Sequence, residues 1–363
     1  MNAEEKRKLK LEKELALTPV SNFLEDYEAD LGDGTKQYRG LVSGFTEVDD
    51  LVSGLDRFII LGGRSGAGKT TLALQLAMGV AERGTPTLIY SLEMCRAEVI
   101  TKLLQVISHE QYRYDLYANS IDLRGNDPKL DKDTKDAIKS SIEHLNEVGK
   151  QIYVRDSANG VPDILDYDNK RKDKYSLKSI YQDVVDAKAK HKVDRVLVLI
   201  DSIQDIVKVE NAQQTQAEVK ALADITTLQQ MTGATILATA QKNKASTTSS
   251  DDYGDLMGSM SYIHKPNTVI MLDTPREMLS GKGPKGGLKI EQQQQIRDIE
   301  NDARAGMPSP ALLKVIKGRF TGAKAIPLKY HGKFAYFTGG RVTRYIEFYK
   351  GCGLIDDEVN RNV

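Results

Sequence analysis

The chain has little cysteine and no tryptophan: Cys95 and Cys352 are its only two cysteines among 363 residues. They lack C-x-x-C spacing and a nearby histidine pair, so neither a disulfide framework nor a structural zinc is expected. The longest purely aliphatic run, Val196 to Ile200, is far too short to span a bilayer, and no membrane partner is expected. The charged N-terminus lacks the apolar core of a signal peptide, which predicts a cytoplasmic protein.

The chain also lacks net charge, because 51 Lys and Arg residues balance 51 Asp and Glu residues. No bulk positive field therefore indicates a nucleic-acid partner, and any contact with DNA has to be local. A channel lined by a few basic loops would suffice, since affinity follows the phosphates that are neutralised. The composition, 40% hydrophobic and 28% charged, is that of a globular protein with a sizeable core.

One segment combines a short apolar stretch, a glycine-rich turn and a helical pattern. Residues 58–61 read as a buried strand, G-x-x-x-x-G-K-T follows, and a helical pattern covers 72–78. This is a P-loop, in which Lys69 reaches the β- and γ-phosphates and the Thr70 hydroxyl ligates Mg²⁺. An ordinary glycine-rich turn is the alternative, and the flanking strand and helix patterns count against it. ATP, or another nucleoside triphosphate, is expected to bind with Mg²⁺ at Gly63, Arg64, Ser65, Gly66, Ala67, Gly68, Lys69, Thr70 and Thr71.

From residue 41 onward, strand and helix patterns alternate, which predicts an α/β fold with a mainly parallel sheet covered by helices on both faces. The expected strands lie near 58–63, 86–92, 151–155, 194–201, 234–240, 267–273 and 312–320. The expected organisation is an N-terminal arm with one short helix at 1–38, an ATPase domain at 39–350 and a tail at 351–363. Two excursions interrupt the alternation: a polar helical stretch at 113–149, and a loop with a polar helix at 275–310, expected as a mobile insertion.

Three further strands end in polar side chains that could complete a site. Asp201 ends a buried strand, as in a Walker B motif that holds magnesium or orients Thr70, although an aspartate there could also cap the next segment. Glu93 follows another strand, which we expect next to the P-loop strand, so that its carboxyl end faces the γ-phosphate. Glu93 could then be the general base that orients the attacking water. The alternative is a glutamate that only favours the N-terminus of the next helix. Gln241 ends a third strand and could contact the γ-phosphate, so that the position of the loop that follows would depend on whether this phosphate is bound.

Basic residues stand in two later places. The loop at 242–251 begins with Lys242 and Lys244 and contains few apolar residues, as a phosphate-contacting loop would, although a solvated loop would look similar. Lys317 and Arg319 are two residues apart on an expected strand, hence on one face. Two cations on one strand face are usually solvated, so this pair alone does not predict a site.

Together these segments resemble the superfamily-4 hexameric replicative helicases, which include DnaB-type proteins and the helicase half of phage primase-helicases, over roughly residues 40–340. The matching motifs are Ser43-Gly-Phe-Thr-Glu-Val-Asp49 with Ser53-Gly-Leu55, the P-loop, Ser91-Leu-Glu93-Met94, the strand ending at Asp201, Asp255-Leu256-x-Gly258-Ser259 and Lys317-x-Arg319-Phe-Thr-Gly322. The last motif is the most specific, since common P-loop ATPases do not share it.

The resemblance implies a RecA-like ATPase that forms a ring, expected to be a homo-hexamer. Such a ring translocates on single-stranded DNA and unwinds forked DNA during replication, in a bacterial cell or a phage-infected host. By the same resemblance Glu93 is the catalytic glutamate, and Lys317 and Arg319 act in trans on the neighbouring subunit's nucleotide. Asn243 falls with Lys242 in a DNA-binding loop, and Tyr330 lies near the nucleotide base.

The chain departs from the family's pattern in places. Met257 and Met260 stand where the family usually has Arg and Gly, and His264 stands where it has Gln. These positions help to couple DNA to hydrolysis, so the resemblance supports ATP hydrolysis more firmly than translocation. The family's N-terminal domain and a primase domain have no counterpart in these residues, so a primase or loader would be a separate partner.

Two other functions fit part of the pattern. A recombinase-like or clock-type ATPase that forms rings or filaments without unwinding would share the P-loop and the sheet, and the Lys317 and Arg319 motif counts against it. A nucleotide-gated scaffold that binds a replication or defence partner is the other alternative, favoured by Met257, Met260 and the neutral net charge.

Overall fold

The computed structural model describes residues 20–24, 28, 38–118, 130–156, 177–206, 214–242, 261–279, 288–318 and 324–355. The chain divides into two compact units, residues 1–39 and residues 40–363. In the first unit, the described residues include a 3-10 helix, η1 (Val20–Phe23). Most of the expected arm at 1–38, and the tail beyond 355, lie outside the described residues, so both stay predictions.

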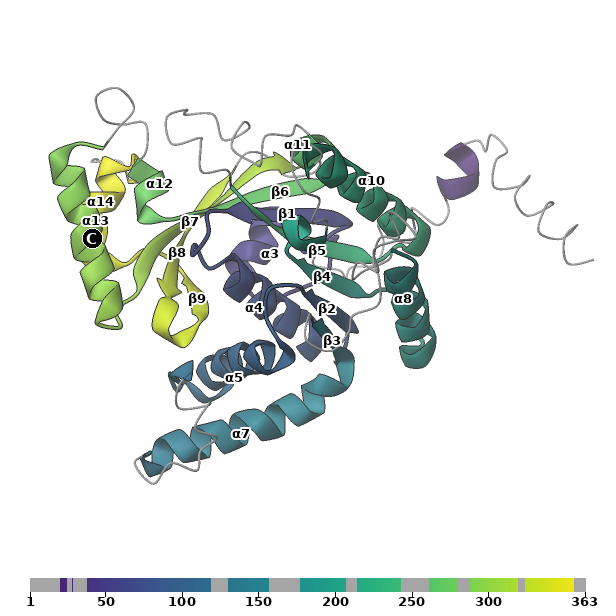
Figure 1. Ribbon diagram of the computed structural model, residues 1–363, viewed down its shortest axis with the longest axis horizontal. Helices are drawn as coiled ribbons and strands as arrows, with labels where there is room; N and C mark the ends of the chain where they lie inside the picture. The colour runs from purple at the N-terminus through teal and green to yellow at the C-terminus, as the bar shows by residue number, and fades with distance from the viewer. Residues whose placement is uncertain are drawn as a thin grey trace, which may run out of the picture. The chain divides into compact units, whose positions relative to one another are not determined.

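The second unit is built on a nine-stranded sheet in the order β3-β2-β4-β5-β1-β6-β7-β8-β9 (Figure 1). Strands β1 to β6 pair in parallel, whereas β7, β8 and β9 continue the sheet in antiparallel fashion. The strands are β1 (Phe58–Gly63), β2 (Thr87–Ser91), β3 (Ile152–Asp156), β4 (Leu197–Asp201), β5 (Thr235–Gln241), β6 (Thr268–Asp273), β7 (Ser309–Gly318), β8 (Ala325–His331) and β9 (Tyr336–Gly339). The predicted α/β class with a mainly parallel sheet is confirmed.

The parallel strands are apolar because both of their faces are covered. Every residue of β1, β2 and β4 is buried, which explains the unbroken aliphatic runs of the sequence. Helices α4 (Lys69–Glu82) and α5 (Arg96–Tyr112) cover one face. The other face is covered by α8 (Leu177–His191), α10 (Gln214–Thr232) and the short α9 (Ile203–Ile206) and α11 (Ser261–His264). The carboxyl ends of parallel strands meet at one edge of a sheet, and this edge collects the P-loop after β1 and the polar residues that end or follow β2, β4 and β5.

The helices are α3 (Thr46–Val52), α4 (Lys69–Glu82), α5 (Arg96–Tyr112), α7 (Lys132–Val148), α8 (Leu177–His191), α9 (Ile203–Ile206), α10 (Gln214–Thr232), α11 (Ser261–His264), α12 (Pro275–Leu279), α13 (Ile290–Arg304) and α14 (Ile346–Gly351). The 3-10 helices of this unit are η2 (Gly149–Gln151), η6 (Gly332–Phe334) and η7 (Thr343–Tyr345). Helix α7 packs beside α5 in Figure 1. Within the described part of the chain, no helix has both the length and the apolar character to cross a membrane.

The antiparallel end of the sheet carries a smaller core of its own. Helices α12, α13 and α14 pack on β7 through Met278, Leu279, Ile296, Ile299, Leu312, Phe348 and Tyr349. The stretch at 275–310 thus contains the expected polar helix as α13. Residues 280–287 of this stretch lie outside the described part of the chain, so the expected mobility of the insertion stays a prediction. Strands β8 and β9 were not predicted, since Pro327 lowers the strand signal of β8 and β9 has only 4 residues.

Candidate nucleotide-binding and hydrolysis site

The P-loop connects the end of β1 to the start of α4. Gly66 and Gly68 have φ angles of +79° and +93°, which favour glycine, and Lys69 is the first residue of α4. Gly68 also lies close to other parts of the chain, because a Cβ atom there would be 2.8 Å from Cζ of Phe337 and 3.1 Å from Cζ of Tyr330. Backbone N–H groups at the N-terminus of a helix favour an anion, which fits the expected phosphate position.

Lys69 and Thr70 meet the carboxylate that ends β4. The Lys69 ammonium donates to the Arg64 carbonyl oxygen over 2.8 Å, and the residue as a whole is 8% exposed. Burial lowers the pKa of Lys69, whereas the carboxylates of Asp201, Glu93 and Glu277 raise it. The Thr70 hydroxyl donates to Oδ2 of Asp201 over 2.8 Å. The predicted magnesium pair therefore lies together, which fits a cation held between the P-loop and β4.

The Asp201 carboxylate is fixed from a second side. The hydroxyl of Thr239, on the neighbouring strand β5, donates to its Oδ1. Burial raises the pKa of Asp201, while the hydrogen bonds from Thr239 and Thr70 and the charge of Lys69 lower it. Thr239 was not predicted as a site residue; its signal is a polar side chain near the carboxyl end of the strand 234–240, whose other polar residue, Thr235, lies at the opposite end.

Glu93 and Gln241 come together at the same edge of the sheet. The Gln241 amide donates to Oε1 of Glu93 over 3.3 Å. Burial raises the pKa of Glu93, the carboxylates of Asp205 and Asp201 raise it further, and Lys69 lowers it. A carboxylate with a raised pKa close to the lysine of a P-loop is suited to accept a proton from water.

The expected position of the Glu93 strand was wrong. Strand β2 is not next to the P-loop strand β1, because β4 and β5 lie between them. Glu93 reaches the site because the chain turns over the end of β4 after β2, where the Leu92 N–H donates to the Asp201 carbonyl oxygen over 2.7 Å.

A series of hydrogen bonds through Gln204, Tyr262 and Glu218 extends from the site away from the P-loop. These three residues were not predicted from the sequence. Gln204 accepts from the backbone N–H of Gln241 over 3.2 Å and donates to the Tyr262 hydroxyl over 3.1 Å. Tyr262 in turn donates to the buried Glu218 carboxylate over 3.0 Å. The signal in the sequence was a polar side chain shortly after the strand that ends at Asp201.

Lys102 of α5 is a second lysine near Asp201 that sequence reasoning did not select. Burial lowers the pKa of Lys102, whereas the carboxylates of Asp201 and Glu98 raise it. Lys102 lies in the second turn of α5, which begins with Arg96 shortly after Glu93. A lysine this close in sequence to Glu93 was the signal that could have indicated Lys102.

A cavity of about 480 Å³ opens beside the P-loop. Its walls come from P-loop residues 64–67, the start of α12, helix α13, the start of β7 and Tyr330. Arg64 pairs with Glu277 here, with 2.9 Å between Nε and Oε1. Burial raises the pKa of Tyr330, and a hydrogen bond with Thr71 opposes this rise. The cavity has the size of a small-molecule site and continues from the phosphate-binding turn.

A larger cavity of about 780 Å³ lies elsewhere, around the edge strand β3 and helices α5, α7 and α8. Its lining residues include none of the P-loop residues, nor Glu93, Asp201 or Gln241. Of these two cavities, the smaller one is lined by P-loop residues, 64–67, and the larger one is not.

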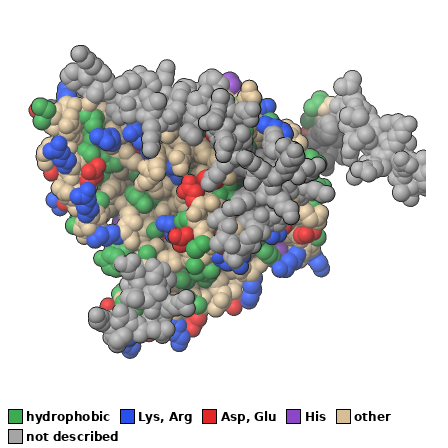
Figure 2. All heavy atoms as spheres, viewed as in Figure 1, with side chains coloured by type: hydrophobic (Ala, Val, Ile, Leu, Met, Phe, Trp, Pro, Cys, Tyr) green, Lys and Arg blue, Asp and Glu red, His purple; other side chains and the backbone are tan. Residues whose placement is uncertain are grey.

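The predicted DNA-binding and trans-acting residues are only partly described. The Lys242 N–H donates to the Gly63 carbonyl oxygen over 3.0 Å, so the loop after β5 begins at the P-loop. Lys317 of β7 donates through Nζ to the carbonyl oxygens of Ile263, His264 and Pro266, at 2.7, 3.0 and 2.7 Å. The other expected residues, Asn243, Lys244, Met257, Met260 and Arg319, lie outside the described residues. On the face in Figure 2, the described Lys and Arg side chains are interspersed with Asp and Glu, in keeping with a neutral chain.

The fold and the site together define a P-loop ATPase of RecA-like architecture. The family model for the DnaB-like helicase C terminal domain matches residues 40–339. The chain therefore belongs to the DnaB-like helicases, which are ATP-dependent DNA helicases of replication, and the resemblance seen in the sequence is confirmed.

Solved structures share this fold. The ATPase domain of G40P aligns with a TM-score of 0.67 and 17% identity, over 90% of this chain and 100% of that one. A DnaB-like replicative helicase, whose structure was described with its interactions with primase, aligns with a TM-score of 0.65 and 16% identity, over 90% of this chain and 68% of that one. A comparison with curated protein sequences finds no match.

Proposed function

We propose that this chain is the motor subunit of a ring-shaped helicase that hydrolyses ATP to translocate on single-stranded DNA and unwind forked DNA. The observation that carries the proposal is the convergence of Lys69, Thr70, Asp201, Glu93 and Gln241 at one edge of the sheet. This set combines phosphate binding, a metal position and a general base, which is what phosphoryl transfer to water needs.

In this proposal each residue of the site has a separate task. Lys69 and the P-loop amides hold the phosphates, and Thr70 with Asp201 would hold Mg²⁺. The metal would neutralise the charge that develops on the phosphates. Glu93 orients the attacking water and accepts its proton, and Gln241 reports the state of the γ-phosphate. The cavity beside Tyr330 holds the nucleoside.

The family to which the chain belongs supports a proposal about the ring and its partners. We propose a homo-hexamer in which Arg319 acts on the nucleotide bound by the adjacent subunit. Lys317 would join it only after its ammonium releases the three carbonyl oxygens of its own chain to which it donates. An arginine supplied in trans stabilises the transferring phosphoryl group only when the interface between subunits is closed. A separate primase or loader would engage this ring, in the cytoplasm of a bacterial cell or a phage-infected host.

The DNA-binding loop gives a testable prediction. Lys242, Asn243 and Lys244 are proposed to contact DNA, and the two lysines are proposed to neutralise phosphates. Replacing both lysines with alanine should weaken single-strand binding similarly for different sequences. The slope of log affinity against log salt should fall by about 0.7 for each phosphate that the variant no longer neutralises, measured by fluorescence anisotropy.

The control for that experiment is the double variant of Lys139 and Lys150, two exposed lysines of α7 and η2. It removes the same charge at a distance from the proposed DNA path and should keep the wild-type salt slope. An unchanged slope in the Lys242 and Lys244 variant would remove this loop from the DNA path.

Strand displacement on a forked duplex, measured beside ATP hydrolysis with and without single-stranded DNA, tests the function itself. A helicase should show hydrolysis stimulated by single-stranded DNA and ATP-dependent release of the displaced strand, both absent from Lys69→Ala. Stimulated hydrolysis without displacement would favour the clock-type or recombinase-like alternative. Slow hydrolysis that DNA does not stimulate would favour a nucleotide-gated scaffold.

A further inference from the structure

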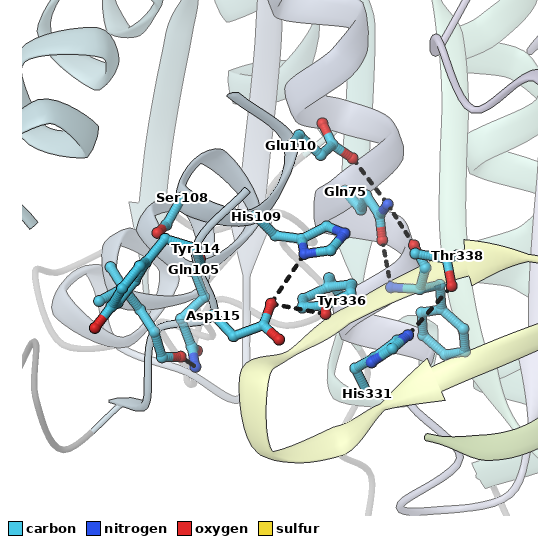
Figure 3. A network of polar contacts seen from close by, with 12 residues as sticks. Gln75, Gln105, Ser108, His109, Glu110, Tyr114, Asp115, His331, Tyr336 and Thr338 are labelled. Carbon is cyan, nitrogen blue, oxygen red and sulfur yellow. Dashed lines mark hydrogen bonds and ion pairs between the residues drawn. The ribbon is translucent and has the colours of Figure 1, made fainter. Parts of the chain in front are cut away.

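Gln75 of the P-loop helix α4 makes three hydrogen bonds that tie it to distant parts of the chain. Its Oε1 accepts from the Phe337 N–H over 2.8 Å, and its Nε2 donates to the Phe337 carbonyl oxygen over 3.0 Å. The same Nε2 donates to Oε1 of Glu110 over 2.9 Å. Figure 3 shows Gln75 between α5 and the β8–β9 hairpin. The side chain pairs with the Phe337 backbone as a neighbouring β-strand would, so it fixes the position of this residue on β9.

Phe337 in turn supports Tyr330. The two residues are paired in the register of β8 and β9, and their rings stack with centroids 4.5 Å apart and planes 18° apart. Both rings lie against Gly68 of the P-loop, where a Cβ atom would be 2.8 Å from one ring and 3.1 Å from the other. Tyr330 also lines the cavity beside the P-loop. A displaced Phe337 would therefore let the Tyr330 ring move relative to the nucleoside site.

The hairpin has a second attachment, which does not involve Gln75. Tyr336 stacks on His109 of α5 at 3.5 Å between ring centroids and donates its hydroxyl proton to Asp115 over 2.8 Å. His331 of β8 also stacks on the Tyr336 ring, with 4.3 Å between the ring centroids. Because these contacts remain when Gln75 is replaced, the hairpin should stay folded and only the Phe337 segment should loosen.

Glu110 completes the arrangement around Gln75. Burial raises the pKa of Glu110 to about 6, and the hydrogen bond from Gln75 opposes this rise. At neutral pH the carboxylate is thus mainly ionised and accepts from the Gln75 amide. This bond leaves only one orientation of the amide, with Oε1 toward the Phe337 N–H.

We propose that Gln75 is a positioning residue for the nucleoside: through Phe337 it holds the Tyr330 ring where the base of the bound nucleotide stacks. The inference rests on the proposed function, since it requires a nucleotide at the P-loop. Gln75 acts on the base-dependent part of binding and leaves the phosphate-dependent part to the P-loop. It contacts neither phosphate nor metal in this scheme.

The test separates these two parts by comparing ADP with inorganic pyrophosphate, both with Mg²⁺, in isothermal titration calorimetry. The variant is Gln75→Met, which keeps the length and helix propensity of the side chain and removes its hydrogen bonds. We expect ADP affinity to fall about tenfold, the scale of one aromatic stacking contact with a base, and pyrophosphate affinity to stay unchanged. Ser108→Ala is the control, since it removes a partly buried hydrogen bond of α5 whose acceptor, the Tyr114 carbonyl oxygen, is not in the hairpin.

A double-mutant cycle tests the route through Tyr330. Tyr330→Ala should produce the same selective loss of ADP affinity, and adding Gln75→Met to it should cause little further loss. Additive losses would contradict the route through Tyr330 and overturn the inference. Phe337→Leu, which keeps the backbone that Gln75 binds, should also weaken ADP selectively and provides an independent variant if Gln75→Met does not fold.

Other results would also overturn the inference. Equal loss of ADP and pyrophosphate binding in Gln75→Met would mean that the residue acts on the P-loop, and no loss of either would mean that it positions nothing. Wild-type protein that binds neither ligand would overturn the proposed nucleotide site, a failure that the wild-type titration alone reveals.

Discussion

Glu93→Gln is expected to bind ATP with near wild-type affinity and to hydrolyse it about 10² to 10⁴ times more slowly, the usual contribution of a general base. The amide keeps the size and polarity of the side chain but cannot accept the proton of the attacking water. The carboxylate is suited to this role because burial and the neighbouring Asp205 and Asp201 raise its pKa. Steady-state phosphate release and calorimetric ATP binding measure the two quantities.

Glu98→Gln is the matched control for this prediction. Glu98 allows the same substitution in the first turn of α5, where its carboxylate accepts from the Cys95 N–H, over 2.8 Å, in a capping box. The control should keep the wild-type rate at a small cost in helix stability. If Glu93→Gln hydrolysed ATP at the wild-type rate with single-stranded DNA present, the general base would have to be another residue.

Arg319→Ala is expected to spare nucleotide binding and to reduce hydrolysis by about a thousandfold, the effect of losing an arginine finger. Each subunit keeps its own P-loop, so binding measured by calorimetry should not change. The reduction should appear at protein concentrations at which the ring is present by mass. Normal hydrolysis under those conditions would contradict the proposal that Arg319 acts in trans.

Mixed rings make this prediction sharper. Rings assembled from Arg319→Ala and Lys69→Ala subunits would contain some interfaces that pair an intact P-loop with an intact arginine. Rings of either variant alone contain none, so the mixture should hydrolyse ATP faster than both. Hydrolysis is the decisive measurement, because unwinding could need several intact interfaces in succession.

The sequence was sufficient where a function depends on consecutive residues. The P-loop is such a case: Lys69 and Thr70 follow a glycine-rich turn between a strand and a helix, and this order of elements can be recognised from consecutive residues. Asp201 could likewise be selected because it ends a run of aliphatic residues. The carboxyl ends of parallel strands share one edge, so the meeting of such residues could be predicted without the strand order.

The strand order and the antiparallel hairpin were decided only by the tertiary structure. Hydrophobic periodicity indicates that a segment is a buried strand but not which strand is its neighbour, and so Glu93 was expected beside β1 when β4 and β5 lie between. The contact between Gln75 and Phe337 joins residues 262 positions apart and depends on the packing of β9 against α4. Gln204 and Thr239 likewise gain their partners from packing and register. The sequence by itself determined the chemistry of the phosphate site, because that chemistry is local; the surroundings that orient it depend on long-range contacts that a local pattern does not contain.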